Sequence, residues 1–497
     1  MRPLTAFTSA LCLIFGTALV HAEPARPEAK PIEPPEDVSA TPPEPPDMDF
    51  MHVLASRGLH DIEQERWNAY GQVSLIGHYR SPLAAKYTNL NGSSKSLLPA
   101  EEGSWTGTAT LYLGAKLWPG AEAYVVPEVV SERPLSNLAG LGGAIQNGEL
   151  QKSGGAAPTI YLARAYLQQT IALGGEAEHR ESGQMQLGTT VRSRRLVITL
   201  GKFSTIDFLD KNTFAGDIRR QFLNIAFMTH AAWDFAADAR GYTWGAVVEG
   251  HWDAYTIRAA HTMVPINPND LDIDFRFWKF YGDQLEIERA HHLYGSPGAV
   301  RLLGYRNHEN MGVFKEAVAA YDADPRKNAA ACTGYHYDST NRAAPDLCWV
   351  RRPTTKVGLG INVEQALGDK LGVFARGMYS DGKSEVYAYM SADASLSFGA
   401  LAKGTWWGRP LDSLGAGMGL AWISNEHAEY LGRGGVDGFI GDGAIRHAME
   451  SVFEVFYSVR VLPPLWLTVD YQHITHPAYN ADRGPLDLVG GRLHVEI

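Results

Sequence analysis

RLVITLGKFSTIDFLDKNTFAGDIRRQFLNIAFMTHAAWDFAADARGYTWGAVVEG, residues 195–250, has the pattern of a strand, a long loop and a second strand. Side chains alternate with the two-residue period of a β-strand over residues 196–201 and again over residues 242–249. Residues 204–240 are far longer than a usual hairpin connection, and a loop of this length in a β protein is usually functional or disordered. The stretch therefore predicts a β fold built around one large loop.

The composition of this loop argues against disorder. Its aromatic side chains give it apolar surface to bury, and its charged side chains need partners or water. The aromatic residues include Phe208, Phe214, Phe222, Phe227, Trp233 and Phe235, and the charged ones include Asp207, Asp210, Asp217, Arg219, Arg220, Asp234, Asp238 and Arg240. We expect the loop to fold back into the interior of a hollow β structure.

The chain begins with MRPLTAFTSALCLIFGTALVHA, which has the form of a secretory signal peptide cleaved after Ala22. A single anchoring helix is the alternative, but the apolar run is short and a proline tract follows. Residues 23–47, EPARPEAKPIEPPEDVSATPPEPPD, predict an extended periplasmic linker, either a spacer or a partner-binding segment. The mature protein therefore leaves the cytoplasm.

Residues 48–67 have the apolar periodicity of a short amphipathic helix, which could plug or cap a periplasmic mouth. Its apolar positions are Phe50, Val53, Leu54, Leu59 and Ile62. Cys12 leaves with the signal peptide, so Cys332 and Cys348 are expected to form a disulfide in an external loop, with a metal or redox site as the alternative. Closing that loop would stabilise the fold by roughly 3 kcal/mol on the entropic model.

Composition and motifs exclude several classes of protein. After the signal peptide no apolar run of about 18 residues remains, so the chain is not a helical membrane protein. The net charge of −11 disfavours a nucleic-acid partner. The sequence contains neither a His-Glu-x-x-His zinc motif nor a Gly-x-Ser-x-Gly nucleophile motif. We therefore predict no enzyme, no catalytic residues, no cofactor and no metal, although Asp270, Asp272 and Asp274 form either a solvated acidic loop or a Ca²⁺ site.

From Tyr70 onward, period-two alternation recurs over segments of about 9 to 13 residues, the length of a tilted strand that crosses a bilayer. The clearest case is residues 105–118, where Leu111 and Leu113 alternate with Thr110 and Tyr112. A soluble sandwich and a membrane barrel both give this alternation. Connections alternate between tight turns and long loops, and this favours an outer-membrane barrel.

This rule predicts sixteen strands. They lie near residues 69–79, 105–118, 121–131, 159–171, 195–203, 241–250, 253–263, 283–291, 298–306, 354–365, 370–380, 391–404, 413–424, 449–461, 465–474 and 486–497. An even number places both chain ends on the periplasmic side, and sixteen strands enclose a water-filled lumen. The connection at residues 172–194 breaks the short-turn rule.

Several blocks resemble the carbohydrate-selective outer-membrane porins of the OprB type. They are GKFSTIDFLDKN, DIRRQF, AAWDFAADARGYTWGA, GTATLYLGAKLWPGAEAYVVPE, PTIYLARAYLQQT, SPGAVRLLGYRNHENMG and KGTWWGRPLDSLGAGMG, and they sample most of the chain from about residue 67. The resemblance implies an all-β, 16-stranded antiparallel transmembrane barrel over residues 68–497 with an inward-folded long third loop. The final residue, Ile497, departs from the aromatic residue with which such barrels usually end and which the barrel assembly machinery reads.

The resemblance also implies a function, namely passive, selective diffusion of small carbohydrates across the bacterial outer membrane into the periplasm. The expected partners are small carbohydrates, outer-membrane lipid and the barrel assembly machinery, and a homo-oligomer stays open. An export pore for a longer polysaccharide is one alternative. An outer-membrane barrel enzyme or adhesin is another, favoured only if the long loop lay outside the pore.

Alternation also nominates residues that face the lumen, because a charge facing lipid costs roughly 2 to 4 kcal/mol near the midplane. These residues are Glu122, Glu128, Arg164, Gln168, Arg258, Glu286, Glu288, Arg301, Arg376, Glu454, Arg460 and Asp470. From the loop we add Asp217, Arg219, Arg220, Gln221, Trp233, Asp234 and Arg240 as constriction residues. Guanidinium and carboxylate groups bind paired sugar hydroxyls, and the rings of Tyr112, Trp118, Tyr124, Tyr166 and Trp233 offer stacking faces. Each charge has a second interpretation, as wall solvation, an ion pair or a loop anchor.

Overall fold

A computed structural model describes residues 49–150, 154–388 and 390–497. The expected signal peptide, residues 1–22, and the proline-rich linker, residues 23–47, lie outside these described residues. Among the residues that the structure describes, no helix is long and apolar enough to cross a membrane.

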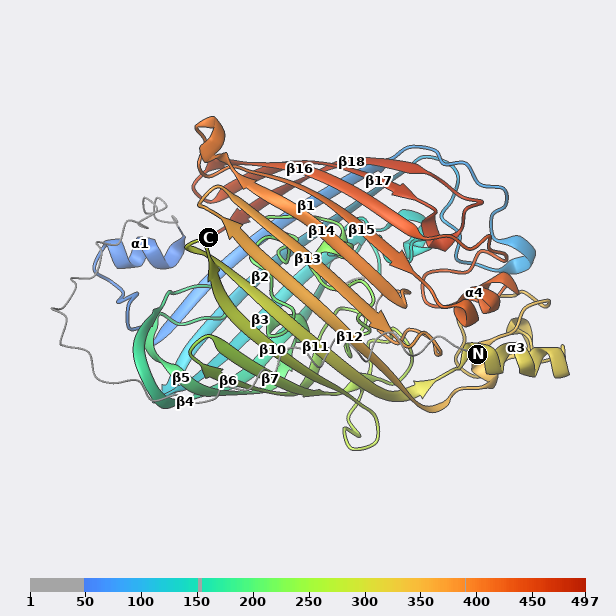
Figure 1. The fold of residues 1–497 in the computed structure, drawn as a ribbon, viewed down its shortest axis with the longest axis horizontal. Coiled ribbons are helices and arrows are strands. Elements are labelled where there is room, and N and C mark those ends of the chain that lie inside the picture. Colours follow the sequence, from blue (N-terminus) through green and yellow to red (C-terminus); the bar gives the residue numbers. More distant parts are fainter. Residues whose placement is uncertain (1–48, 151–153, 389) are drawn as a thin grey trace, which may run out of the picture. The chain divides into compact units, whose positions relative to one another are not determined.

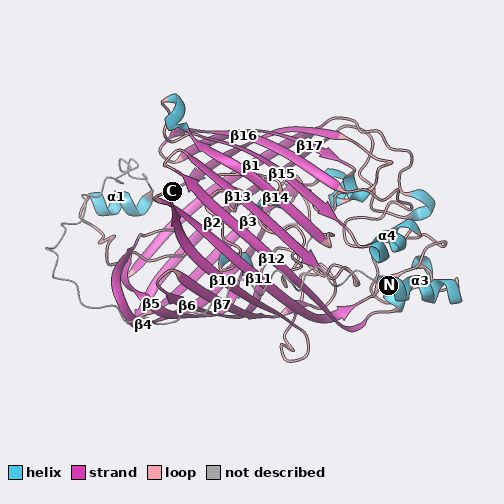
Figure 2. Cartoon of the chain, in the orientation of Figure 1, coloured by secondary structure: helices cyan, strands magenta, loops and turns pink. Residues whose placement is uncertain are grey.

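Sixteen antiparallel strands close into one barrel, in which each strand pairs with its neighbours along the chain and β18 pairs with β1 (Figures 1 and 2). The barrel strands are β1 (Trp67–Arg80), β2 (Glu102–Trp118), β3 (Ala121–Arg133), β4 (Thr159–Arg180), β5 (Thr189–Phe203), β6 (Thr243–Trp252), β7 (Tyr255–Thr262), β10 (Tyr281–Leu293), β11 (Ser296–Met311), β12 (Arg352–Leu367), β13 (Leu371–Ser380), β14 (Ala394–Lys403), β15 (Ser413–Trp422), β16 (Glu450–Leu462), β17 (Leu465–Thr475) and β18 (Leu486–Glu496). A separate two-stranded sheet joins β8 (Val264–Pro265) and β9 (Ile273–Asp274). The predicted strand number is confirmed.

Alternating side chains make these segments barrel strands. In β2, Leu111 and Leu113 are exposed on the outer face, whereas Thr110 and Tyr112 are buried on the inner face. Trp118 does not offer the stacking face in the lumen that the sequence predicts. Half of its surface is exposed, and its indole N–H donates to the Gln169 side chain at the strand end. A register shift between Lys116 and Trp118 turns this ring away from the lumen.

Both chain ends of the barrel meet at the end with short turns, which is the periplasmic end in outer-membrane barrels. Here β4 and β5 continue as a hairpin through most of residues 172–194, the connection that breaks the short-turn rule in the sequence. The hairpin tip, residues 181–188, reaches back to β1. There Ser182 bonds the Tyr70 hydroxyl at 2.7 Å, and the Asn68 amide donates to the Gln186 carbonyl at 2.7 Å.

The helix before the barrel, α1 (Phe50–Ser56), is shorter than predicted. Asp49 caps its start by accepting the His52 N–H, and Gly58, at φ 70°, follows its C-cap. Glycine adopts this left-handed conformation at little cost, so the helix ends there. The buried side chain of α1 is Met51, which packs in a cluster with Tyr70 and other lumen-wall residues, whereas Phe50 is exposed.

The other helices belong to the connections. The α-helices are α2 (Ile225–Met228), α3 (Phe314–Ala323) and α4 (Asn425–Gly432), and the 3-10 helices are η1 (Leu90–Gly92), η2 (Leu135–Leu138), η3 (Thr205–Asp207), η4 (Ala329–Ala331), η5 (Leu347–Trp349), η6 (Gly404–Trp407) and η7 (Pro477–Tyr479). Cys332 and Cys348 form a disulfide in the long connection between β11 and β12, and their Cα atoms are 6.5 Å apart.

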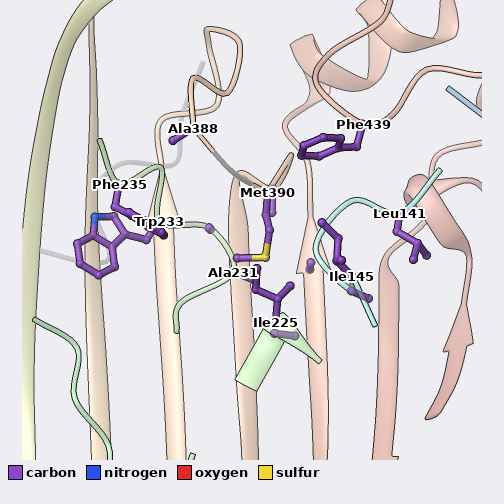
Figure 3. Packing of buried hydrophobic residues seen from close by; sticks show 14 of the residues in the cluster. Leu141, Ile145, Ile225, Ala231, Trp233, Phe235, Ala388, Met390 and Phe439 are labelled. Carbon is purple, nitrogen blue, oxygen red and sulfur yellow. The ribbon is translucent and has the colours of Figure 1, made fainter. Parts of the chain in front are cut away.

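The largest apolar cluster lies among the inward-folded loops and the inner faces of the strands. Figure 3 shows part of it, where Ile225 and Trp233 come from residues 204–242, Ile145 from the β3–β4 connection and Met390 from the β13–β14 connection. Part of the lumen is therefore filled with packed side chains.

Candidate functional site: the lumen and its third loop

The third loop, residues 204–242 between β5 and β6, folds into the barrel, as the sequence predicts. It begins with a capping box in which Ser204 and Asp207 exchange hydrogen bonds around η3. Asn224 caps α2 by accepting the Ala226 N–H. These local bonds satisfy backbone groups that a plain coil would leave unpaired inside the lumen.

Wall carboxylates hold the backbone of the third loop. Glu454 on β16 accepts the Leu223 N–H at 2.6 Å and the Asn224 N–H at 2.9 Å. Further around the wall, Glu286 of β10 accepts the Asp210 N–H at 2.7 Å, and Glu364 of β12 accepts the backbone N–H of Thr213. The loop is thus fixed to the wall at three separate strands.

Aromatic packing fills the lumen beside β13–β16. Phe222 and Phe227 lie 4.7 Å apart between ring centroids, and Phe222 meets Phe456 of β16 at 5.0 Å. Gly417 on β15 makes room for them, because a Cβ there would lie 2.8 Å from the Phe227 ring. The alternating glycines of β15 therefore serve loop packing.

Asp210 is a second anchor, near the start of the third loop. Its carboxylate pairs with Arg376 of β13 at 3.1 Å, lies 3.3 Å from the His230 imidazole and accepts the Thr229 hydroxyl at 2.7 Å. The side chains of Asp210, Arg376 and His230 are almost fully buried. Arg376, nominated as a constriction residue, is thus a partner of the loop inside the packed part of the lumen.

The β3–β4 connection also enters the barrel, which the sequence reasoning missed. The Asn147 amide donates to Thr106 of β2 at 2.9 Å, and Ile145 accepts the Ile225 N–H at 3.0 Å. Residues 141–147, LGGAIQN, form a nearly continuous buried run. The feature of the sequence that indicates this entry is an apolar, glycine-rich segment in a connection that is otherwise expected to face water.

A cavity of about 550 Å³, here the main cavity, remains on the other side of the third loop. It is bounded by the loop, the inner faces of β1, β4 and β18, and the tip of the β4–β5 hairpin. Its charged lining residues are Glu149, Arg164, Asp207, Asp210, Lys211, Asp217, Arg219, Arg240 and Glu496. The mixed charges and amides suit a neutral, hydroxyl-rich solute.

The turn Asp217–Phe222, here the DIRRQF turn, lies at the junction of three cavities. Asp217 lines the main cavity and two neighbouring cavities of about 300 and 220 Å³. The Gln221 side chain shapes the turn by accepting the Gly216 N–H at 2.9 Å and donating to the Thr213 carbonyl at 2.7 Å. Arg492 of β18 donates to the Ile218 carbonyl at 2.7 Å and so fixes the turn to the wall.

Arg219 is held by three wall and loop groups. Its guanidinium donates to Glu149 at 2.9 Å, to Glu128 at 3.1 Å and to the Tyr112 hydroxyl at 3.0 Å. Burial alone would lower the pKa of Arg219, but the adjacent carboxylates outweigh burial and hold it above its ordinary value. These contacts indicate that Arg219 anchors the DIRRQF turn to the barrel wall.

Arg220 has different surroundings. Its guanidinium lies 4.4 Å from the Trp466 ring centroid and 3.6 Å from the Glu496 carboxylate, and 39% of its side chain is exposed. It lines both smaller cavities. The group is therefore partly open to a solute, and its stacking on Trp466 orients its planar donors.

The remaining nominated residues fall into two groups. Arg164 and Arg240 line the main cavity, where Arg164 pairs with Asp207 at 2.6 Å and Arg240 lies over the Tyr161 ring at 4.6 Å. The others lie away from it in ion pairs or packed clusters, namely Glu122 with Arg180, Arg258 with Glu286, Arg301 with Glu364, Asp234 with Lys356, and Trp233 against Phe235.

Comparisons with known proteins identify a family and structures with a similar fold. The family model of the carbohydrate-selective porins, OprB family, matches residues 94–497. The high-pH structure of Pseudomonas putida OprB is similar with a TM-score of 0.62 at 16% identity, covering 90% of this chain and 96% of that chain. The outer-membrane channel DcaP of Acinetobacter baumannii has a TM-score of 0.48 at 11% identity, covering 87% of this chain and 97% of that chain. No curated protein matches the chain.

Proposed function

The chain belongs to the carbohydrate-selective porin family, OprB, and on that premise we propose that small carbohydrates cross the outer membrane through the main cavity beside the third loop. The protein is an outer-membrane porin for the diffusion of sugars. The observation that carries the proposed route is the division of the lumen into a packed side along β13–β16 and a polar cavity along β1, β4 and β18.

Within this route we assign different tasks to the two arginines of the DIRRQF turn. Arg219 fixes the turn, since its guanidinium is used by Glu128, Glu149 and Tyr112. Arg220 contacts the solute where the cavities meet. A rigid planar fork presents several donors to neighbouring sugar hydroxyls, whereas a lysine in its place would be a mobile point charge.

Asp217 and Arg240 complete the proposed solute contacts. The Asp217 carboxylate lines all three cavities and accepts the Arg219 N–H at 2.8 Å. Arg240 enters the main cavity from the end of the third loop. Carboxylate acceptors and guanidinium donors that line one polar cavity can bind a sugar ring edge-on, without an apolar pocket.

The alternative functions are less well supported. An adhesin or a barrel enzyme was favoured only if the long loop lay outside the pore, and the loop packs inside it. An export pore for a long polysaccharide needs a wide continuous lumen, whereas here two loops fill one side of the barrel. Passive uptake of small sugars fits the remaining space best.

The test changes Arg220→Lys, which keeps the charge and removes the planar fork. Losing one hydrogen bond of about 1 kcal/mol should weaken current block by a monosaccharide about fivefold in single-channel recordings. Small-ion conductance should change little. Arg289→Lys, on the exposed outer face of β10, is the matched control. Unchanged sugar block in the Arg220 variant would remove this residue from the solute path.

A further inference from the structure

The fourth loop, residues 263–280 between β7 and β10, leaves the barrel sideways instead of entering it (the yellow-green loop below the wall in Figure 1). Three of its groups are tied to the extracellular loops. Asn269 N–H donates to the Tyr387 carbonyl at 2.7 Å, Asp270 accepts the Ala239 N–H at 2.9 Å, and the Tyr335 hydroxyl donates to the Pro268 carbonyl at 2.8 Å. The segment that follows is therefore held in place on the outside.

This outer segment contacts the extracellular ends of three strands, β6, β7 and β11. Phe275 contacts Trp244 of β6 with ring centroids 6.2 Å apart, and Phe277 contacts His261 of β7 at 6.2 Å. Further along, Phe280 stacks on His308 of β11 at 6.3 Å. The segment thus forms a strap on the outer face of the barrel.

Large apolar side chains of the strap are unusually exposed. Trp278 is 70% exposed, Phe275 59% and Phe277 46%, and Phe277 and Trp278 pack edge to face at 5.1 Å. On the membrane side of this segment, β10 and β7 carry the exposed lipid-facing residues Leu285 and Ile257. The aromatic patch is therefore continuous with the lipid-facing surface at its extracellular edge.

Three cationic side chains lie among these aromatic rings. Arg276 and Arg306 are each 53% exposed, and each is oriented by one carboxylate, Asp274 at 2.5 Å and Asp283 at 2.6 Å. Lys279 is exposed, with its ammonium 5.0 Å from the Phe280 ring centroid. Among the described residues, no protein acceptor takes the Nη1 group of either arginine, so both can donate outward.

We propose that the patch formed by Phe275, Arg276, Phe277, Trp278, Lys279 and Arg306 binds the headgroup of an outer-leaflet glycolipid, which carries both sugar rings and phosphate. The aromatic faces pack on sugar rings and on the first acyl carbons, as interfacial aromatics do. The two guanidinium groups and the ammonium donate to phosphate oxygens. This proposal is independent of the solute path, because these side chains lie outside the barrel.

The carboxylates of Asp274 and Asp283 limit the net positive charge of the patch and thereby shape its specificity. A purely anionic phospholipid would gain little from a nearly balanced surface. A headgroup that combines phosphate with several sugar rings gains stacking and hydroxyl contacts as well. We therefore expect discrimination between phosphorylated glycolipid and simple anionic phospholipid.

The experiment uses the full mature protein in mild detergent and native mass spectrometry, with purified lipid A and, separately, phosphatidylglycerol as probes. The test variant combines Arg276→Ser, Lys279→Ser and Arg306→Ser. Near a membrane surface each cation contributes about fivefold in affinity, so the three changes should lower lipid A retention by about 100-fold. Trp406→Ser, an exposed ring at the periplasmic end, is the control and should retain lipid A.

Phe277→Ser with Trp278→Ser tests the aromatic half and should also lower lipid A retention while sugar-induced current block stays normal. Three outcomes overturn the proposal. They are equal lipid A retention by all variants, equal loss of lipid A and phosphatidylglycerol in the charge variant, and conversion of an oligomer to a monomer by the aromatic variant with lipid retention unchanged. The last would assign the patch to a second copy of the chain.

Discussion

Arg219 and Arg220 are chain neighbours, yet their surroundings predict different phenotypes. Arg219→Ala leaves the buried carboxylates of Glu128 and Glu149 without this partner. Breaking a buried ion pair typically costs about 3 to 5 kcal/mol, so we expect the docked turn to lose stability of roughly that size. Denaturant titration of the purified barrel measures the change, with Arg220→Ala as the control. Equal midpoints for both variants would contradict the anchor role.

His427 on α4 predicts a pH dependence in the extracellular loops. It is fully buried, 3.0 Å from Asp393 and 3.2 Å from Asp437, and stacks on Phe314 at 4.1 Å. Although burial lowers the pKa of His427, the two carboxylates outweigh it and raise the pKa from 6.5 to about 9. A raised pKa gives stability that is fully present below about pH 6.5 and is lost as pH rises through about 9.

We therefore expect hydrogen exchange in residues 425–439, corrected for intrinsic rates, to speed up between pH 7 and pH 9.5. His427→Gln should exchange faster at pH 7 and lose this pH dependence. If the native protein is equally protected across the range, the ion pairs of His427 do not hold the loops together.

At the scale of elements, the third loop controls the open cross-section of the lumen. Replacing residues 206–238 with a short glycine-serine link removes α2, the DIRRQF turn and the aromatic cluster. Conductance should rise severalfold and sugar block should weaken, because solutes would no longer pass a narrow polar cavity. Single-channel recording measures both quantities. Tyr294→Ser, at an almost fully exposed ring in the turn between β10 and β11, is a control that should leave them unchanged.

The disulfide predicts a separate, local effect. Replacing Cys332 and Cys348 by Ser frees an external connection that no longer has its cross-link, at a cost of about 3 kcal/mol in the chain-entropy model. Limited proteolysis should then cut between these positions while sugar transport survives. A transport defect in the folded variant would mean that this connection shapes the pore. Free thiols in the exported protein would exclude the bridge.

Strands were more predictable than their connections. A period-two pattern is local, because each side chain of a strand faces either lipid or lumen, and it located all sixteen strands that close the barrel. The end of α1 and the outward turn of Trp118 depend on Gly58 and on a register shift, which the pattern does not reveal. Likewise, residues 172–194 continue as strands with irregular pairing that interrupts the alternation.

The site was predictable only in outline. Length and aromatic content identified the third loop, but partner choice depends on residues far away in the chain. Asp210 meets Arg376, and Arg219 meets Glu128, only because the barrel has closed. The entry of residues 141–147 into the lumen escaped prediction for the same reason, since their partners lie on β2 and in the third loop.

At the scale of the whole molecule, the lumen is asymmetric, packed on one side and open on the other. A main cavity of about 550 Å³ suits solutes of one or a few sugar rings. In liposome-swelling assays we expect rates to fall steeply from mono- to tetrasaccharides. The loop-replacement variant should show a much shallower dependence on size. Equal rates for all lengths in the native protein would place the route elsewhere.

The hydrogen bonds between the wall carboxylates and the third loop determine which substitutions in that loop the barrel tolerates. Glu454, Glu286 and Glu364 grip the third loop through its peptide N–H groups, which every amino acid except proline supplies. Apart from the side-chain anchors Asp210 and Arg219, the same wall can therefore hold loop segments of different side-chain composition, so solute preference can change, or be redesigned by grafting, while the scaffold stays constant. A proline introduced at Leu223 or Thr213 is the change that such interchangeability does not tolerate.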